Sequence, residues 1–229
     1  MFMTRCPINT SRRDTRKLIE NPYAMHSMIA AAFPTTDVAT EGRILWRIDT
    51  LPNKSKMLYI VSPTRPSMIG IEEQIGFCDL GPQSKTVDYD EFLASIENGR
   101  KYRFRLLGNT VHKVKCPDGK TRMLAHVTNK HRLEWLTGRD GEPNHLARAG
   151  LRPESNGAGD LVMVTDTCDV TTHKHDAKHK KTYPITLSGT QFDGVCTVTD
   201  ADACRRAMAN GVGRAKAFGF GLLTLVPLD

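Results

Sequence analysis

The stretch Gly211-Val-Gly-Arg-Ala-Lys-Ala-Phe-Gly-Phe-Gly221 lies near the end of the chain and leads directly into the apolar residues Leu222–Val226. Two Gly-x-Gly pairs flank Arg214 and Lys216. Glycine adopts positive φ angles and lets other groups approach the backbone closely, so this loop can present N–H groups to phosphate. The spacing matches neither a dinucleotide-binding fingerprint nor a phosphate-binding loop, which requires Gly-Lys-Ser/Thr. The alternative is a glycine-rich turn that only allows tight packing.

The pattern of the remaining sequence repeats one order of elements, β-α-β-β-α-β, twice. The elements of the first cycle are Met1–Pro7, Pro22–Phe33, Gly42–Asp49, Lys56–Ser62, Ser67–Gln74 and Lys85–Tyr89. Those of the second are Lys101–Leu107, Asn129–Leu136, a hairpin of Leu161–Thr172 and Tyr183–Leu187, Val195–Thr199, Asp200–Asn210 and Gly221–Val226. The sequence therefore predicts an α+β protein of two tandem ferredoxin-like (RRM-like) domains. Residues 1–90 form the first, residues 91–99 a linker helix and residues 100–229 the second.

The composition indicates an anionic partner. The 229 residues contain 32 Lys and Arg against 25 Asp and Glu, a formal net charge of +7, and such an excess is most often found in proteins that bind nucleic acid. No apolar run approaches the roughly 18 residues of a membrane span, and the N-terminus does not resemble a signal peptide. The six cysteines form no C-x-x-C pair. We therefore expect a cytoplasmic protein with reduced thiols and no membrane partner.

The predicted helix Pro22–Phe33 carries the candidate catalytic residues. Asn21 is suited to cap it, and Met25, Met28, Ile29 and Ala32 have the spacing of a core-facing stripe. Tyr23 and His26 are three residues apart, so they are neighbours that point away from that stripe. Histidine transfers protons near neutral pH, and a phenol beside it can orient the reacting groups. The alternative is an exposed, inert pair.

Three basic clusters are candidates for binding nucleic acid. One contains Arg12, Arg13, Arg16 and Lys17, and the second is the exposed face of a strand with Arg103 and Arg105. The third, His173-Lys-His-Asp-Ala-Lys-His-Lys-Lys181, lies at the tip of the predicted hairpin, whose arms are apolar. A two-stranded ribbon with a cationic tip can lie along a nucleic-acid groove and contact phosphates. A charge run is otherwise a solvated loop.

The three histidines of the hairpin tip have the spacing H-x-H-x₃-H, which can supply nitrogen ligands to a metal. Lysines flank each histidine and repel a cation, and Asp176 is the only nearby carboxylate. We therefore expect no metal and no cofactor. Cleavage of RNA needs neither a metal nor a cofactor, because the 2′-OH of the RNA lies next to the scissile phosphate and can act as the nucleophile. The protein then has only to transfer protons and to stabilise the developing charge.

Together these residues resemble the CasE family of CRISPR-associated endoribonucleases, the repeat-processing members of the type I-E surveillance complex, Cascade. The resemblance spans nearly the whole chain. Besides the terminal glycine loop and Tyr23-x-x-His26, it rests on Gly42-Arg-Ile-Leu-Trp-Arg-Ile48, Tyr59-Ile-Val-Ser-Pro63 and Gly99-Arg-Lys-Tyr-Arg-Phe-Arg-Leu106. One departure is Asn109-Thr110, where the family often has Asn-Pro.

The resemblance implies metal-independent cleavage of precursor CRISPR RNA at the 3′ base of each repeat stem-loop, leaving a 2′,3′-cyclic phosphate and a 5′-OH. It implies that the enzyme stays on the RNA hairpin with other Cascade subunits. His26 would be the acid–base residue and Tyr23 its partner. The residues expected at the RNA surface are Arg12, Arg13, Arg103, Arg105, Lys174, Lys178, Lys180, Lys181, Gly211, Gly213, Arg214, Lys216 and Gly219.

Two other functions remain open on the residues alone. The first is a non-catalytic module that binds RNA hairpins, although the segment around Phe104 does not match the aromatic RNP1 pattern of RRM proteins. The second is a metal-binding regulator built on the histidine-rich tip, which would contain stoichiometric zinc when purified.

Overall fold

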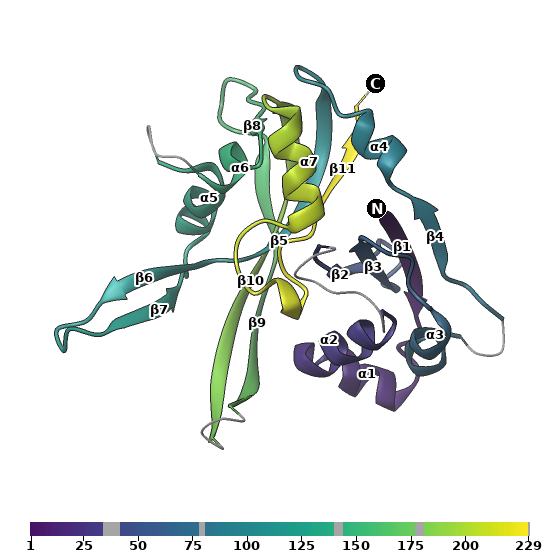
Figure 1. The fold of residues 1–229 in the computed structure, drawn as a ribbon. Coiled ribbons are helices and arrows are strands. Elements are labelled where there is room, and N and C mark those ends of the chain that lie inside the picture. Colours follow the sequence, from purple (N-terminus) through teal and green to yellow (C-terminus); the bar gives the residue numbers. More distant parts are fainter. Residues whose placement is uncertain (34–41, 78–80, 140–143, 177–180, 229) are drawn as a thin grey trace. The chain divides into compact units, whose positions relative to one another are not determined.

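The computed structural model describes residues 1–33, 42–77, 81–139, 144–176 and 181–228 (Figure 1). The chain divides into two compact units. The first consists of Met1–Ser95, Ala209–Gly211 and Ala215–Leu222, and the second of Ile96–Met208, Val212–Arg214 and Leu223–Asp229. The glycine-rich stretch therefore contributes residues to both units.

The first unit is a four-stranded antiparallel sheet of the order β2-β3-β1-β4. Its elements are β1 (Phe2–Ile8), α1 (Arg13–Ile19), α2 (Pro22–Ala31), β2 (Leu45–Thr50), β3 (Lys56–Ser62), α3 (Ile69–Ile75), β4 (Lys85–Asp88) and α4 (Asp90–Ala94). Buried residues of α2 and α3 join those of β1 and β3 in one hydrophobic core. The order and pairing are those of a ferredoxin-like domain.

Helix α2 begins and buries its residues as the sequence predicts. The side chain of Asn21 accepts hydrogen bonds from the backbone N–H groups of Tyr23 and Ala24, and Pro22 occupies the first turn, where proline is favoured. Met25, Met28 and Ile29 are buried, as their spacing predicts. The helix ends at Ala31, two residues before the predicted end, while Phe33 remains buried in the core.

The second unit has the same strand order. Its main sheet runs β11-β5-β10-β8, with β9 also paired to β10, and every pairing is antiparallel. The elements are β5 (Lys101–Asn109), α5 (Asn129–Thr137), α6 (His145–Arg148), β8 (Leu151–Pro153), β9 (Val162–Asp176), β10 (Lys181–Val198), α7 (Ala201–Asn210) and β11 (Leu223–Pro227). The predicted fold class, α+β with two ferredoxin-like domains, is confirmed.

The second unit differs from the sequence prediction in several elements, and the short α6 and β8 were not predicted. Val195–Thr199 is not a separate strand, because β10 continues from the hairpin to Val198 and pairs with β5 along the way. A further ribbon, β6 (Val111–Lys115) and β7 (Thr121–Ala125), forms a two-stranded sheet of its own, and in Figure 1 it extends away from the main sheet. The ribbon was not predicted, because most of its side chains are exposed and its apolar residues do not alternate regularly with polar ones.

Burial along β5 follows the predicted alternation. Tyr102, Phe104 and Leu106 are buried, whereas Arg103 is exposed. None of the helices in the described part of the chain is long and apolar enough to cross a membrane.

Candidate active site

The candidate catalytic pair lies on the side of α2 that faces away from the core. Tyr23 is 48% exposed, and His26 is half-buried. Burial lowers the pKa of His26 below its ordinary value of 6.5, because a charged imidazolium loses solvation there. The ring is therefore uncharged at pH 7, and an uncharged imidazole can accept a proton.

A short 3₁₀ helix, η2 (Lys216–Phe218), lies against both α2 and β2 in the same unit. It places Lys216, a residue of the glycine-rich stretch, on the segment that packs beside the helix of Tyr23 and His26. The preceding residue, Ala215, has a φ of +61°, a conformation that costs a non-glycine residue on the order of 1 kcal/mol. The backbone is thus held in a strained form directly before the lysine.

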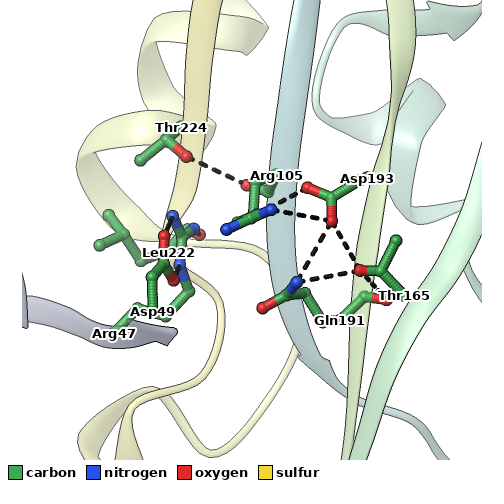
Figure 2. Close-up of polar contacts among 8 residues, drawn as sticks. All are labelled: Arg47, Asp49, Arg105, Thr165, Gln191, Asp193, Leu222 and Thr224. Atoms are coloured by element: carbon green, nitrogen blue, oxygen red, sulfur yellow. Dashed lines mark hydrogen bonds and ion pairs between the residues drawn. The ribbon is translucent and has the colours of Figure 1, made fainter. Parts of the chain in front are cut away.

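Two residues of β2, Trp46 and Arg47, hold the stretch Ala215–Leu222 in place. The indole nitrogen of Trp46 donates a hydrogen bond to the carbonyl of Ala217 at 3.2 Å. Arg47 donates through Nη1 to the carbonyl of Leu222 at 2.8 Å (Figure 2). The same guanidinium pairs with both carboxylate oxygens of Asp49, at 2.6 and 3.0 Å, and is only 2% exposed. A buried, bidentate ion pair of this kind is strongly directional.

The glycines of this stretch adopt the positive φ angles that the sequence predicts. The values are +76° at Gly211, +75° at Gly213 and +87° at Gly219. Each of these glycines also lies against a large side chain. An added Cβ would approach Leu45 within 2.9 Å at Gly211, Trp135 within 3.1 Å at Gly213 and Trp46 within 2.7 Å at Gly219. Tight packing therefore accounts for these glycines, and contact of their N–H groups with RNA stays a prediction.

Lys216 and Arg43 are neighbouring cations in the first unit. Burial and the positive charge of Arg43 both lower the pKa of Lys216. Two like charges that repel each other in a partly buried position favour the binding of an anion, which relieves the repulsion. Arg43 is exposed and was not predicted from the sequence, since only its proximity to Lys216 identifies it. Arg214 is also exposed.

A family model described as CRISPR associated protein matches residues 1–227. The chain belongs to this CRISPR-associated protein family. The CRISPR-associated endoribonuclease Cse3 of Thermus thermophilus is 25% identical over 229 residues, which cover 99% of this chain and 100% of that protein. The predicted resemblance to the CasE family is confirmed.

Solved structures of this family share the fold. CRISPR endoribonuclease Cse3 bound to a 19-nucleotide RNA superimposes with a TM-score of 0.78 at 23% identity, covering 99% of this chain and 100% of that chain. Cas6e from Escherichia coli K-12 gives a TM-score of 0.57 at 18% identity over 100% of both chains. A chain of a CRISPR RNA-guided surveillance complex gives 0.60 at 18% identity, again over 100% of both.

The basic residues predicted to bind RNA differ in whether their side chains already form hydrogen bonds within the protein. Arg13 and Arg103 are exposed. Arg12 donates a hydrogen bond to the carbonyl of Glu73 at 2.8 Å, which fixes its side chain against α3. Arg105 pairs through two nitrogens with Asp193 on the neighbouring strand, at 2.6 and 3.1 Å (Figure 2).

The carboxylate of Asp193 also accepts hydrogen bonds from Thr165 and Gln191. Arg105 therefore stabilises the pairing of β5 with β10, and its contact with RNA stays a prediction. The sequence could not reveal this, because the register that sets Asp193 opposite Arg105 depends on strand pairing between distant segments.

The hairpin that was predicted to carry the basic tip is present as β9 and β10. Its backbone register places Lys181 opposite Asp176 and Lys174 opposite Tyr183. Lys178 and Lys180 lie outside the described residues, as do the side chains of residues 172–185. The prediction that these lysines bind RNA therefore stands on the sequence. Among the side chains that the structure describes, no three His, Cys, Asp or Glu residues are grouped so that they could hold a metal ion.

Proposed function

We propose that this chain is a metal-independent endoribonuclease that cuts precursor CRISPR RNA at the 3′ base of each repeat stem-loop. Membership of the CRISPR-associated family and the full-length relative named an endoribonuclease support the proposal. So do the similar solved structures of Cse3 bound to RNA. The observation that carries the chemistry is the placement of half-buried His26 one helical turn from the exposed Tyr23 on α2.

In the proposed reaction, His26 accepts the proton of the ribose 2′-OH, and the resulting alkoxide attacks the adjacent phosphorus. The bond from phosphorus to the 5′-oxygen breaks as the new bond forms. The products are a 2′,3′-cyclic phosphate and a 5′-OH, whose proton the hydroxyl of Tyr23 supplies and regains from water. No oxidation state changes, and the attacking group comes from the RNA itself.

The phosphorane carries extra negative charge, which the protein must stabilise. Lys216 and Arg43 supply two neighbouring cations in the unit that contains His26. Their mutual repulsion is relieved when an anion lies between them, and the relief grows with the charge of that anion. This pair therefore favours the transition state over the substrate.

The basic tip of the β9–β10 hairpin would bind the RNA stem, and the protein would remain on the cleaved hairpin as a subunit of the surveillance complex. A similar chain in a CRISPR RNA-guided surveillance complex supports this assignment. Binding through lysines predicts an affinity that falls steeply with salt.

The test is incubation of the purified protein with the repeat stem-loop RNA in EDTA. We expect cleavage with a 2′,3′-cyclic phosphate end. A single 2′-deoxy substitution just upstream of the cut is expected to abolish cleavage while binding persists, because the nucleophile is then missing. Binding without cleavage of the unmodified RNA, with or without magnesium, would show a non-catalytic RNA-binding module. Cleavage only after magnesium is restored would refute the proposed chemistry.

A further inference from the structure

The second unit contains a cavity of about 530 Å³, a volume within the range of pockets that hold small ligands. It is open to solvent and lined by the base of the β6–β7 ribbon, α5 and α6, so all of its lining residues belong to one unit. Nothing in the proposed cleavage reaction uses this cavity.

Aromatic rings make up much of its wall. The rings of His112 and His126 are stacked, with centroids 4.4 Å apart and planes at 26°. The ring centroid of His131 lies 6.0 Å from that of His126. The ring centroids of Trp135 on α5 and His145 on α6 are 4.0 Å apart. Four histidines and a tryptophan from four segments of the chain thus line one cavity.

The wall is held rigidly by its surroundings. The ring of Trp135 stacks on that of Phe192, with centroids 6.0 Å apart and planes at 7°. Its indole lies so close to Gly108 and Gly213 that a Cβ at either position would crowd it. The backbone N–H of His126 donates a hydrogen bond to the backbone carbonyl of Thr110 at 2.9 Å. A cavity that is already formed binds its ligand without the cost of ordering side chains.

Two of the four imidazole rings in the wall are uncharged at neutral pH, and arginines lie at the edge of the cavity. Burial, with the charges of neighbouring histidines and arginines, lowers the pKa values of His126 and His145, so both rings are neutral at pH 7. Arg139 at the edge is paired with Glu134 at 2.9 Å. Arg148 on α6 is exposed and makes no ion pair with the side chains that the structure describes.

We propose that this cavity binds one unpaired nucleotide of an RNA chain, with the base against the imidazole rings of His126 and His131 and the phosphate at Arg148. Unpaired RNA bases are recognised by stacking on aromatic rings, histidine included, and their phosphates by arginine. The neutral imidazole of His126 also offers both a donor and an acceptor to the base edge. That the RNA is a CRISPR repeat rests on the proposed function, but the chemistry of the cavity does not.

The experiment measures the fluorescence of 2-aminopurine placed, one position at a time, in the loop and in both single-stranded flanks of the repeat RNA. We expect one position to change its fluorescence strongly when the full-length protein binds. An abasic nucleotide at that position is expected to weaken binding about tenfold, in line with the loss of one stacked base. His131→Ala and Arg148→Ala are each expected to remove the fluorescence change and to weaken binding to a similar extent. The control Arg206→Ala, which removes an exposed charge from α7 of the same unit, should change neither.

A probe that responds at no position, or that responds equally in His131→Ala, would overturn the proposal. If AMP, CMP, GMP or UMP binds in a manner that depends on His131 while abasic RNA binds as well as intact RNA, the cavity takes free nucleotides instead, and the RNA assignment is wrong. If the stem-loop does not bind at all, the proposed function fails. The cavity is then judged by the same probe in an unstructured oligonucleotide, where a response that requires His131 supports it and its absence refutes it.

Discussion

His26 in the first unit and His126 in the second both have pKa values lowered by burial, yet their neighbours differ in kind. His26 shares its helix with an exposed phenol, and a segment carrying a lysine lies against that helix. His126 is stacked on another imidazole and lies in a wall of rings. A neutral imidazole surrounded by proton-transfer and charge-stabilising groups is suited to chemistry, whereas one surrounded by rings is suited to holding a base. The lowered pKa alone therefore does not mark the catalytic histidine.

Removing each histidine in turn tests whether the two sites have different roles. His26→Ala is expected to lower the single-turnover cleavage rate at saturating protein by about 10²- to 10⁴-fold, the usual contribution of a general acid or base, with little change in RNA affinity. His126→Ala is the matched control, since it deletes the same side chain from the other neutral site. Its rate at saturation should stay within about twofold of the wild type. Similar losses from both variants would contradict the distinction.

A second prediction concerns the cations beside α2. Lys216→Ala is expected to lower the saturated cleavage rate by roughly 10- to 100-fold, because the charge developing on the phosphorane loses one of its partners. Lys216→Arg should restore most of the rate. Lys85→Ala removes an exposed lysine from the same unit and serves as the control for net charge. If the two alanine variants behave alike, Lys216 acts only through overall charge.

The dependence of the cleavage rate on pH reports which protonation state of His26 is active. Because burial lowers the pKa of His26 below 6.5, its neutral form predominates at pH 7 and is lost on acidification. If that form accepts the proton, the single-turnover rate should be flat near pH 7 and fall about tenfold per pH unit well below the pKa. In His26→Ala this acidic limb should disappear. A rate that rises as the pH falls through 6.5 would show that the charged form is the active one.

A substitution at Gly219 tests how much the packing of the glycine-rich stretch against Trp46 of β2 contributes to stability. A Cβ there would lie 2.7 Å from Trp46, and φ is +87°. Gly219→Ala is therefore expected to destabilise the protein by about 2–4 kcal/mol, from overpacking together with backbone strain. Gly99 has a similar φ of +83° but no atom within 4 Å of an added Cβ, so Gly99→Ala should cost only the strain, about 1 kcal/mol. Chemical denaturation measures both, and equal losses would show that the contact with Trp46 is unimportant.

Several elements could be predicted from the sequence because local signals determine them. Asn21-Pro22 and the stripe of Met25, Met28 and Ile29 specify the start and the buried face of α2. The alternation in β5 specifies which of its residues face the core. The candidates Tyr23 and His26 followed from that helical geometry. The ribbon β6–β7 and the short elements α6 and β8 carry no such periodicity, and they were missed.

What the sequence could not supply is the pairing of distant residues. That Gly219 makes room for Trp46, that Gly213 makes room for Trp135 and that Asp193 pairs with Arg105 all depend on tertiary packing. The histidines at 112, 126, 131 and 145 are separated along the chain by up to 33 residues, and only the fold brings them into one cavity.

The most direct test of the account is cleavage by His26→Ala of a repeat RNA in which sulfur replaces the bridging 5′-oxygen at the cut. A sulfur leaving group departs without protonation, so it compensates for a missing general acid but not for a missing general base. If His26 withdraws the proton of the 2′-OH, the variant should remain slower than the wild type by the same factor on the sulfur and the oxygen substrates. Cleavage of the sulfur substrate by the variant at the wild-type rate would contradict that role and assign His26 to the leaving group.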